Sequence, residues 1–203
     1  MDKIDLKQTL KHLYSPSAKE AAIVDVPPMS FLMIDGQGDP NTSETFQEAI
    51  GALYAVSYTL KFRLKKQGSP LDYTVMPLEG LWWVEDLDAF SFERRDDWRW
   101  TLMIAQPEHI TAALVADALE EARRKKDLPS LARLRFEDFH EGLCVQIMHL
   151  GPYADEPATI APLHDFAENS GHRLRGKHHE IYLGDPRRTA PEKLKTVLRH
   201  PVE

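Results

Sequence analysis

The chain has 203 residues, of which 42% are hydrophobic and 28% are charged, as is typical of an ordinary globular domain. A formal net charge of −7 argues against a nucleic acid as partner. Cys144 is the single cysteine, so a disulfide within the chain is excluded. With no apolar signal segment and no long apolar run, the sequence predicts a cytoplasmic protein that does not enter a membrane.

The first half of the chain predicts a polar arm over residues 1–20, followed by strands and two helices. The Asn-Thr-Ser-Glu sequence at 41–44 indicates a helix start, because a capping side chain precedes an acidic residue by three positions. The elements expected in this half are strands over 23–26 and 29–34, a helix from the capping sequence to about 66, strands over 73–76, 81–84 and 98–105, and a helix over 110–126.

The second half repeats this plan, with strands over 131–139 and 143–150, a helix over 156–169 and a strand over 178–183. A capping box at 189–192 predicts a last short helix. We therefore expect an α+β fold, in which two strand–helix–strand–strand modules (about 21–128 and 129–203) form one domain with pseudo-twofold symmetry. A cleft between the modules would be a favoured place for a ligand.

The late strand, residues 178–183, carries polar and aromatic side chains on one face. Side chains alternate along a strand, so Glu180 and Tyr182 share a face while Ile181 and Leu183 share the other. If the Ile/Leu face packs on the core, Glu180 and Tyr182 point together toward whatever lies opposite. The pattern fits either a contact with a small molecule or a solvated face with a half-packed tyrosine.

Two local sequences carry a family resemblance: Met-Pro-Leu-Glu-Gly-Leu-Trp-Trp at 76–83, and Lys-His-His-Glu-Ile-Tyr-Leu-Gly-Asp-Pro at 177–186 with the segment at 191–199. They resemble the GyrI-like small-molecule-binding family, which includes the effector-binding domains of multidrug-responsive transcription regulators. The resemblance implies that Glu180 lies at the floor of an aromatic pocket. Nothing before residue 20 resembles a DNA-binding helix-turn-helix, which disfavours a regulator.

One branch of that family is similar in its paired tryptophans and its His-His-Glu strand. This branch is associated with hydrolysis of the strained cyclopropane of duocarmycin- and yatakemycin-like DNA alkylators. The resemblance therefore implies a cyclopropanoid cyclopropyl hydrolase that acts in detoxification. The alternative is a multidrug-binding protein that sequesters its ligand without turnover, and a weaker one is an adaptor that inhibits a protein partner such as gyrase.

A planar ligand needs flat apolar walls, which tryptophan and tyrosine supply. Of the adjacent Trp82 and Trp83 only one can line a cleft, and we select Trp83 as a ligand contact. Trp98, Trp100 and Tyr182 are the other predicted ligand-binding residues. Packing in the core or on the surface is the competing interpretation for Trp98 and Trp100.

Opening an electrophilic cyclopropane requires a positioned water and stabilisation of the oxygen that receives the electron pair. Glu180 is the predicted group that orients or deprotonates the water, because desolvation in an apolar cage raises a glutamate pKa toward neutrality. Glu79 is the second catalytic candidate, and Tyr54 could donate a hydrogen bond to the ligand oxygen. The alternatives are a solvent-exposed turn for Glu79 and core packing for Tyr54.

No cofactor motif is present, since the Gly-Gln-Gly turn at 36–38 lacks the third glycine of a dinucleotide site. His172, His178 and His179 have no metal-binding spacing, and the last two face opposite sides of a strand, so no metal site is predicted. The expected partner is a hydrophobic, aromatic or cationic small molecule, and a homodimer is compatible with the sequence.

Overall fold

The computed structural model describes residues 3–85 and 94–203, which divide into two compact units. The first unit holds the described residues of Met1–Thr9, Met29–Met76 and Trp82–Phe139, and the second holds Leu10–Pro28, Pro77–Leu81 and His140–Glu203. Each unit combines helices with antiparallel strands. The predicted α+β class is therefore confirmed.

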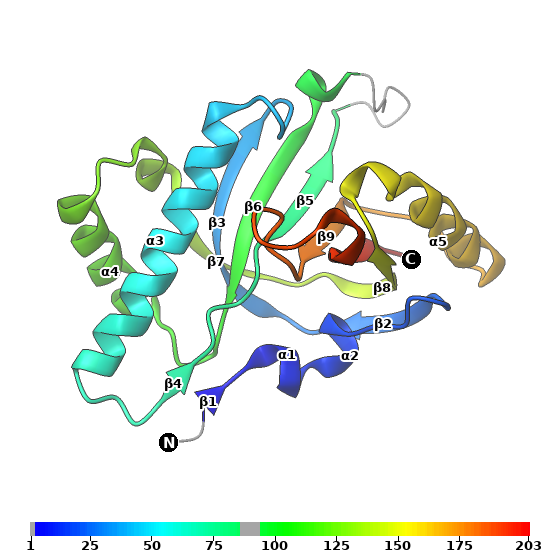
Figure 1. The fold of residues 1–203 in the computed structure, drawn as a ribbon. Helices are drawn as coiled ribbons and strands as arrows, with labels where there is room; N and C mark the ends of the chain where they lie inside the picture. The colour runs from blue at the N-terminus through cyan, green and yellow to red at the C-terminus, as the bar shows by residue number, and fades with distance from the viewer. Residues whose placement is uncertain (1–2, 86–93) are drawn as a thin grey trace. The chain divides into compact units, whose positions relative to one another are not determined.

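In the first unit, β3 (Met29–Gln37) pairs antiparallel with β6 (Arg99–Gln106) on one side and with β7 (Arg135–Phe139) on the other. Helix α3 (Glu44–Lys66) packs on β3 and β6, and α4 (Ala112–Lys125) packs against α3 (Figure 1). The remaining elements of this unit are β1 (Lys3–Ile4), which pairs parallel with β4 (Asp72–Tyr73), α1 (Leu6–Thr9), and the 3₁₀ helices η2 (Arg95–Asp97) and η3 (Pro129–Arg133).

The long helix α3 forms where the sequence predicts it. The Ser43 side chain accepts a hydrogen bond from the Phe46 N–H and caps the first turn, where an acidic residue also favours the positive end of the helix dipole. An apolar stripe along this helix is buried, with Leu53 and Leu60 both at 0% exposure. Tyr54 lies beside this stripe and is half-buried.

In the second unit, the strand order is β2 (Ala22–Val26), β8 (Gly142–Leu150), β10 (Lys195–Pro201), β9 (His178–Tyr182), and all three pairings are antiparallel. Helix α5 (Pro157–Asn169) packs on β8, and the core between them holds Val145, Leu163 and Leu198, all at 0% exposure. The remaining elements are α2 (Lys11–Tyr14), η4 (Tyr153–Asp155) and η5 (Pro191–Lys193).

Strand β5 (Glu79–Trp83) is shared, since its first residues belong to the second unit and its last two to the first. The two units do not coincide with the two halves of the sequence. Strand β2, from the first half, belongs to the second unit, and β7, from the second half, belongs to the first. Each half of the sequence thus supplies one strand to the unit formed mainly by the other half.

The C-terminal segment differs from its prediction. A helix does begin at Pro191, but its N-cap is Ala190 and no side chain caps it. This helix, η5, lasts a single turn, and the residues after it form β10. This strand lies between β8 and β9 and pairs with both. A run of Thr, Val, Leu and Arg that is buried on both faces carries no period-2 signal, which is why the sequence analysis missed it.

Two predicted strands are shorter than expected. Pro129–Arg133 is the 3₁₀ helix η3, so β7 begins only at Arg135, and only Asp72 and Tyr73 form a strand in the segment before β5. Among the helices of the described residues, none combines the length and the apolar character needed to cross a lipid bilayer.

Candidate functional site

Strand β9 presents two different faces, as the alternation in the sequence predicts. His179 and Ile181 are buried at 1% and 0% exposure, whereas the side chains of His178 and Glu180 on the opposite face are 16% and 15% exposed. Strand β10 holds β9 in register, with Glu180 opposite Leu198 and Tyr182 opposite Thr196. The polar face of β9 is therefore a fixed, partly accessible surface.

Glu180 and Tyr182 contact one another on this face. The Tyr182 hydroxyl donates a hydrogen bond of 2.7 Å to Oε2 of Glu180. The Tyr182 ring packs edge-on against Tyr153 of η4, with 5.5 Å between the ring centroids. Tyr153 itself is 37% exposed. A carboxylate that is oriented by a tyrosine thus lies beside aromatic surface, a combination suited to a flat ligand with a polar edge.

Glu156 is a second carboxyl group at this place, and the sequence analysis did not select it. It lies immediately before α5 and is only 4% exposed, and its side chain makes no capping hydrogen bond. Burial raises the pKa of Glu156 to about 9, and the negative charge of Glu180 contributes to the rise, while the nearby Thr196 hydroxyl opposes it. Glu156 is therefore protonated at neutral pH.

Glu156 and Glu180 together form an acid pair. A buried carboxyl group that keeps its proton, next to a more accessible carboxyl group, provides an acid and a base at one place. No local motif marks Glu156, because the sequence around it shows only an ordinary helix start. Its environment is created by residues that are distant in sequence, on β9 and β10.

The opposite face of β9 is fixed by a buried charge cluster. Its members are Tyr14, Glu79, Glu141, Gln146, His179 and Arg199. His179 bridges two carboxylates, with Nε2 3.0 Å from Oε2 of Glu79 and Nδ1 3.0 Å from both oxygens of Glu141. An imidazole that donates from both nitrogens is the charged form. Burial alone would lower the pKa of His179, but these carboxylates raise it to about 9.

The remaining hydrogen bonds of the charge cluster reach two other elements. The Tyr14 hydroxyl of α2 donates to Oε1 of Glu79 at 3.0 Å, and Arg199 of β10 donates to Glu141 at 3.2 Å and to Gln146. Burial alone would raise the pKa of Glu141, but His179 and Arg199 hold it at about 2. The cluster thus contains ionised groups that compensate one another, and it locks the backbone that carries Glu180.

These contacts decide one alternative for Glu79. It is 1% exposed and bonded to Tyr14 and His179, so the interpretation of this residue as a solvent-exposed turn is wrong. Of the seven predicted site residues, Glu79, Glu180 and Tyr182 belong to the second unit, where the structure brings Glu180 and Tyr182 into contact.

The other four predicted site residues, Tyr54, Trp83, Trp98 and Trp100, belong to the first unit. Trp100 is 0% exposed, and its ring packs edge-on against Phe46 with 5.1 Å between centroids. A ligand would reach it only if the side chains that cover it moved. Trp83, Trp98 and Tyr54 are half-buried and so partly accessible. Their contact with a ligand stays a prediction.

The fold and the acid pair define a small-molecule-binding α+β domain with ionisable groups beside aromatic surface. The sequence profile of the GyrI-like small molecule binding domain matches residues 19–203. The chain therefore belongs to the GyrI-like family, as its local sequences suggested.

Solved structures of high similarity come from Listeria innocua. One is a conserved protein with 43% sequence identity and a TM-score of 0.92, and the match covers 99% of this chain and 100% of that one. Another is a hydrolase with 42% identity and a TM-score of 0.89, and the match covers both chains completely. The C-terminal domain of EcmrR, at 12% identity and a TM-score of 0.56 over 91% of this chain and 97% of that one, shares the fold. Among curated protein sequences, none matches this chain significantly.

Proposed function

We propose that this protein hydrolyses a strained, electrophilic ring in a planar aromatic small molecule, and that cyclopropane-bearing DNA alkylators are its substrate class. The observation that carries the proposal is the acid pair, in which Glu156 is protonated at neutral pH beside a Glu180 held by Tyr182. The hydrolase from Listeria innocua, similar over the whole chain, supports a hydrolytic reaction. The biological role would be detoxification.

The proposed reaction adds one water molecule to the substrate. The water oxygen bonds to the methylene carbon of the cyclopropane while the ring C–C bond breaks. The electron pair of that bond moves into the conjugated dienone, whose oxygen takes up a proton and becomes a phenol. Glu180 accepts the proton from the attacking water, which is general base catalysis. Glu156, protonated at the start, donates the proton that this oxygen takes up, and proton exchange with water then returns both carboxyl groups to their starting states.

The hydrogen bond from Tyr182 orients the Glu180 carboxylate, and the Tyr182 and Tyr153 rings offer apolar surface to the aromatic part of the substrate. Tyr54 is the proposed donor to the oxygen on which negative charge develops. Glu79 is buried and bonded within the charge cluster, so we assign it a positioning role that acts through His179 on β9. Trp83, Trp98 and Trp100 are the further aromatic contacts proposed for the ligand.

The test is mass spectrometry of a cyclopropane-bearing alkylator incubated with the purified full chain. We expect a product that is heavier by one water and that forms in excess over the protein. Glu180→Gln should slow this reaction by roughly 10²–10⁴-fold, the usual contribution of a general base. Tyr182→Phe should slow it by roughly tenfold or more, since a hydrogen bond to a charged group contributes about 1.5–3 kcal/mol.

Glu168→Gln is the matched control, because Glu168 is an exposed glutamate on the same helix that follows Glu156. This variant should react as the wild type does. If the alkylator stays unchanged but still quenches tryptophan fluorescence, the hydrolase proposal fails for that substrate. The protein would then be a binding protein that sequesters such compounds. A Glu180→Gln variant with wild-type turnover would remove Glu180 from the mechanism.

A further inference from the structure

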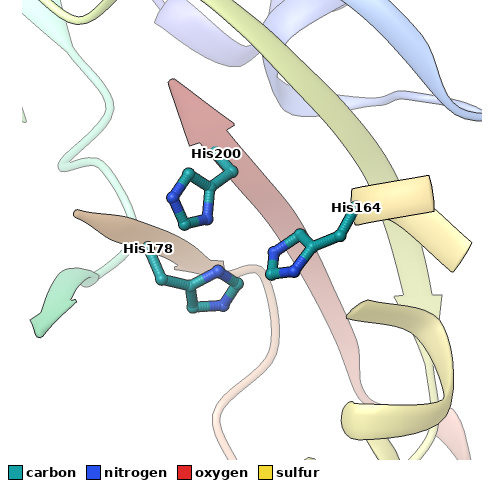
Figure 2. Close-up of side chains that lie close together, drawn as sticks. All are labelled: His164, His178 and His200. Atoms are coloured by element: carbon teal, nitrogen blue, oxygen red, sulfur yellow. The ribbon is translucent and has the colours of Figure 1, made fainter. Parts of the chain in front are cut away.

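Three histidines from three separate elements of the second unit face one another. They are His164 on α5, His178 on β9 and His200 on β10 (Figure 2). One ring nitrogen of each lies within 4.8 Å of those of the other two. The ring centroids of His164 and His200 are 5.1 Å apart, and those of His178 and His200 are 5.8 Å apart. The histidines whose spacing was considered in the sequence are His172, His178 and His179, and spacing alone does not bring His164 and His200 together with His178.

One ring nitrogen of each histidine in this cluster has no hydrogen-bond partner among the described residues. Within residues 3–85 and 94–203, Nε2 of His164 and Nδ1 of His200 are buried without a hydrogen-bond partner. Nε2 of His178 lies 3.3 Å from Oε1 of Glu180 without the alignment of a hydrogen bond. Buried polar atoms normally have partners, and orphaned ones require an explanation such as an ion. A cation between the rings would satisfy the orphaned nitrogens of His164 and His200.

We propose that His164, His178 and His200 form a binding site for a divalent transition-metal ion, with Zn²⁺ as the best-suited ion. Imidazole nitrogens suit zinc, whereas Mg²⁺ and Ca²⁺ require oxygen ligands. Zn–N bonds of about 2.0–2.1 Å in a tetrahedron place the ligating nitrogens about 3.3 Å apart, so small side-chain rotations bring these three rings into range.

Three protein ligands leave the fourth position of a tetrahedral zinc open to water, as in catalytic zinc sites. All three residues are half-buried. Metal-bound histidines are commonly oriented by a nearby carboxylate. Glu180, whose Oε1 lies 3.3 Å from Nε2 of His178, is in a position to do this. The site goes beyond the proposed hydrolysis and stands without it, because it rests on the geometry of the histidines alone.

The test is direct metal binding by the full chain after treatment with a chelator. Titration with Co²⁺ should give the visible absorption bands of a tetrahedral nitrogen site at one equivalent per chain, and Zn²⁺ should abolish them by displacement. Zn²⁺ competition against a chromogenic chelator should give micromolar affinity or tighter. His164→Ala, His178→Ala and His200→Ala should each weaken binding by roughly 100-fold or more, since even indirect support of a metal ligand is worth 10–100-fold.

His12→Ala is the matched control, because His12 is an exposed histidine on α2 of the same unit. It should bind Zn²⁺ as the wild type does. Zn²⁺ should also raise the melting temperature of the wild type and of His12→Ala but not of the cluster variants. His200→Gln, which preserves size, replaces His200→Ala if that variant does not fold. Failure of the wild type to bind submillimolar Zn²⁺, or equal binding by all three cluster variants, would overturn the proposal whatever the outcome with the alkylator.

Discussion

Replacing Glu156 by glutamine should make the folded protein more stable at neutral and alkaline pH. Glutamine has nearly the size and shape of a protonated glutamic acid, and it carries no charge at any pH. Glu156 is buried next to Glu180, so its ionised form is strongly disfavoured in the folded chain. The wild type must either hold a proton there or bear a buried charge, and the variant avoids both.

The size of the effect follows from the pKa of about 9 in the folded state against the usual value of 4.5. Between these values the folded protein keeps a proton that the unfolded chain has released, so the free energy of unfolding falls as the pH rises. The fall is about 1.4 kcal/mol per pH unit, and pH 7 lies about 2.5 units above the usual pKa. Glu156 therefore lowers stability at pH 7 by about 3 kcal/mol as an upper estimate.

The pKa shift of His179 also makes the free energy of unfolding fall as the pH rises, over part of the same pH range. Its pKa is raised from 6.5 to about 9, so its contribution to stability is present below the unfolded pKa and is lost as the pH rises through the folded one. The pH dependence of the wild type alone is thus no test of Glu156. The difference between the wild type and Glu156→Gln isolates the glutamate, because the charge cluster is unchanged in both.

The assay is urea unfolding, followed by tryptophan fluorescence, from pH 5 to pH 9. The two proteins should differ by less than about 1 kcal/mol at pH 5, and the variant should become progressively more stable as the pH rises. Glu168→Gln, exposed on α5, should follow the wild type throughout. Infrared spectra at pH 7 should show a protonated-carboxyl band in the wild type that the Glu156→Gln variant lacks. Parallel stability curves for the two proteins over this range would refute the reasoning.

Three further substitutions test the fold by the same urea assay at pH 6. His179→Leu should destabilise the protein by roughly 3–5 kcal/mol, because it leaves buried carboxylates without their cation; a loss below 1 kcal/mol would mean that the cluster is not charged. Gly36→Ala should cost roughly 1–3 kcal/mol, since its Cβ would lie 2.1 Å from Cη2 of Trp100. Gly51→Ala, in open space on α3, should instead stabilise by about 0.5–1 kcal/mol, and a loss there would show an unseen contact.

Much of the fold follows from local signals in the sequence. The capping sequence before α3 and the alternation along β9 each depend on residues that are close in the chain, and the structure places these elements as predicted. Strand β10 was missed because its neighbours bury both of its faces, and a strand buried on both sides has no alternating pattern.

The candidate site was only partly predictable for the same reason. Glu180 and Tyr182 are two residues apart on one strand, so their contact is visible in the sequence. Glu156 and the histidine cluster are brought to this region by α5, β9 and β10, which are far apart in the chain. Spacing rules for metal ligands and acid pairs describe residues on one helix or strand. They do not detect groups whose members come from separate elements.

The buried carboxyl groups near the two faces of β9 are neutralised in different ways. In the charge cluster, the carboxylates of Glu79 and Glu141 are balanced by His179 and Arg199, so the buried groups sum to no net charge. Within the described residues, no cationic side chain forms an ion pair with Glu156. A bound proton neutralises this carboxyl group instead. A structural carboxylate gains from a permanent cation, because its charge never has to change. A carboxyl group that exchanges protons during a reaction has to change its charge, so it has to be left without a permanent cation.

This difference predicts opposite couplings between stability and turnover. Variants of the charge cluster should lose stability and turnover together, because those groups hold β9 in place without touching the substrate. Glu156→Gln should gain stability at pH 8 and lose turnover of the alkylator, since it removes the exchangeable proton. Measuring both quantities on the same samples separates the two roles. A Glu156→Gln variant that is more stable and equally active would show that the raised pKa of Glu156 is a cost of packing with no part in the chemistry.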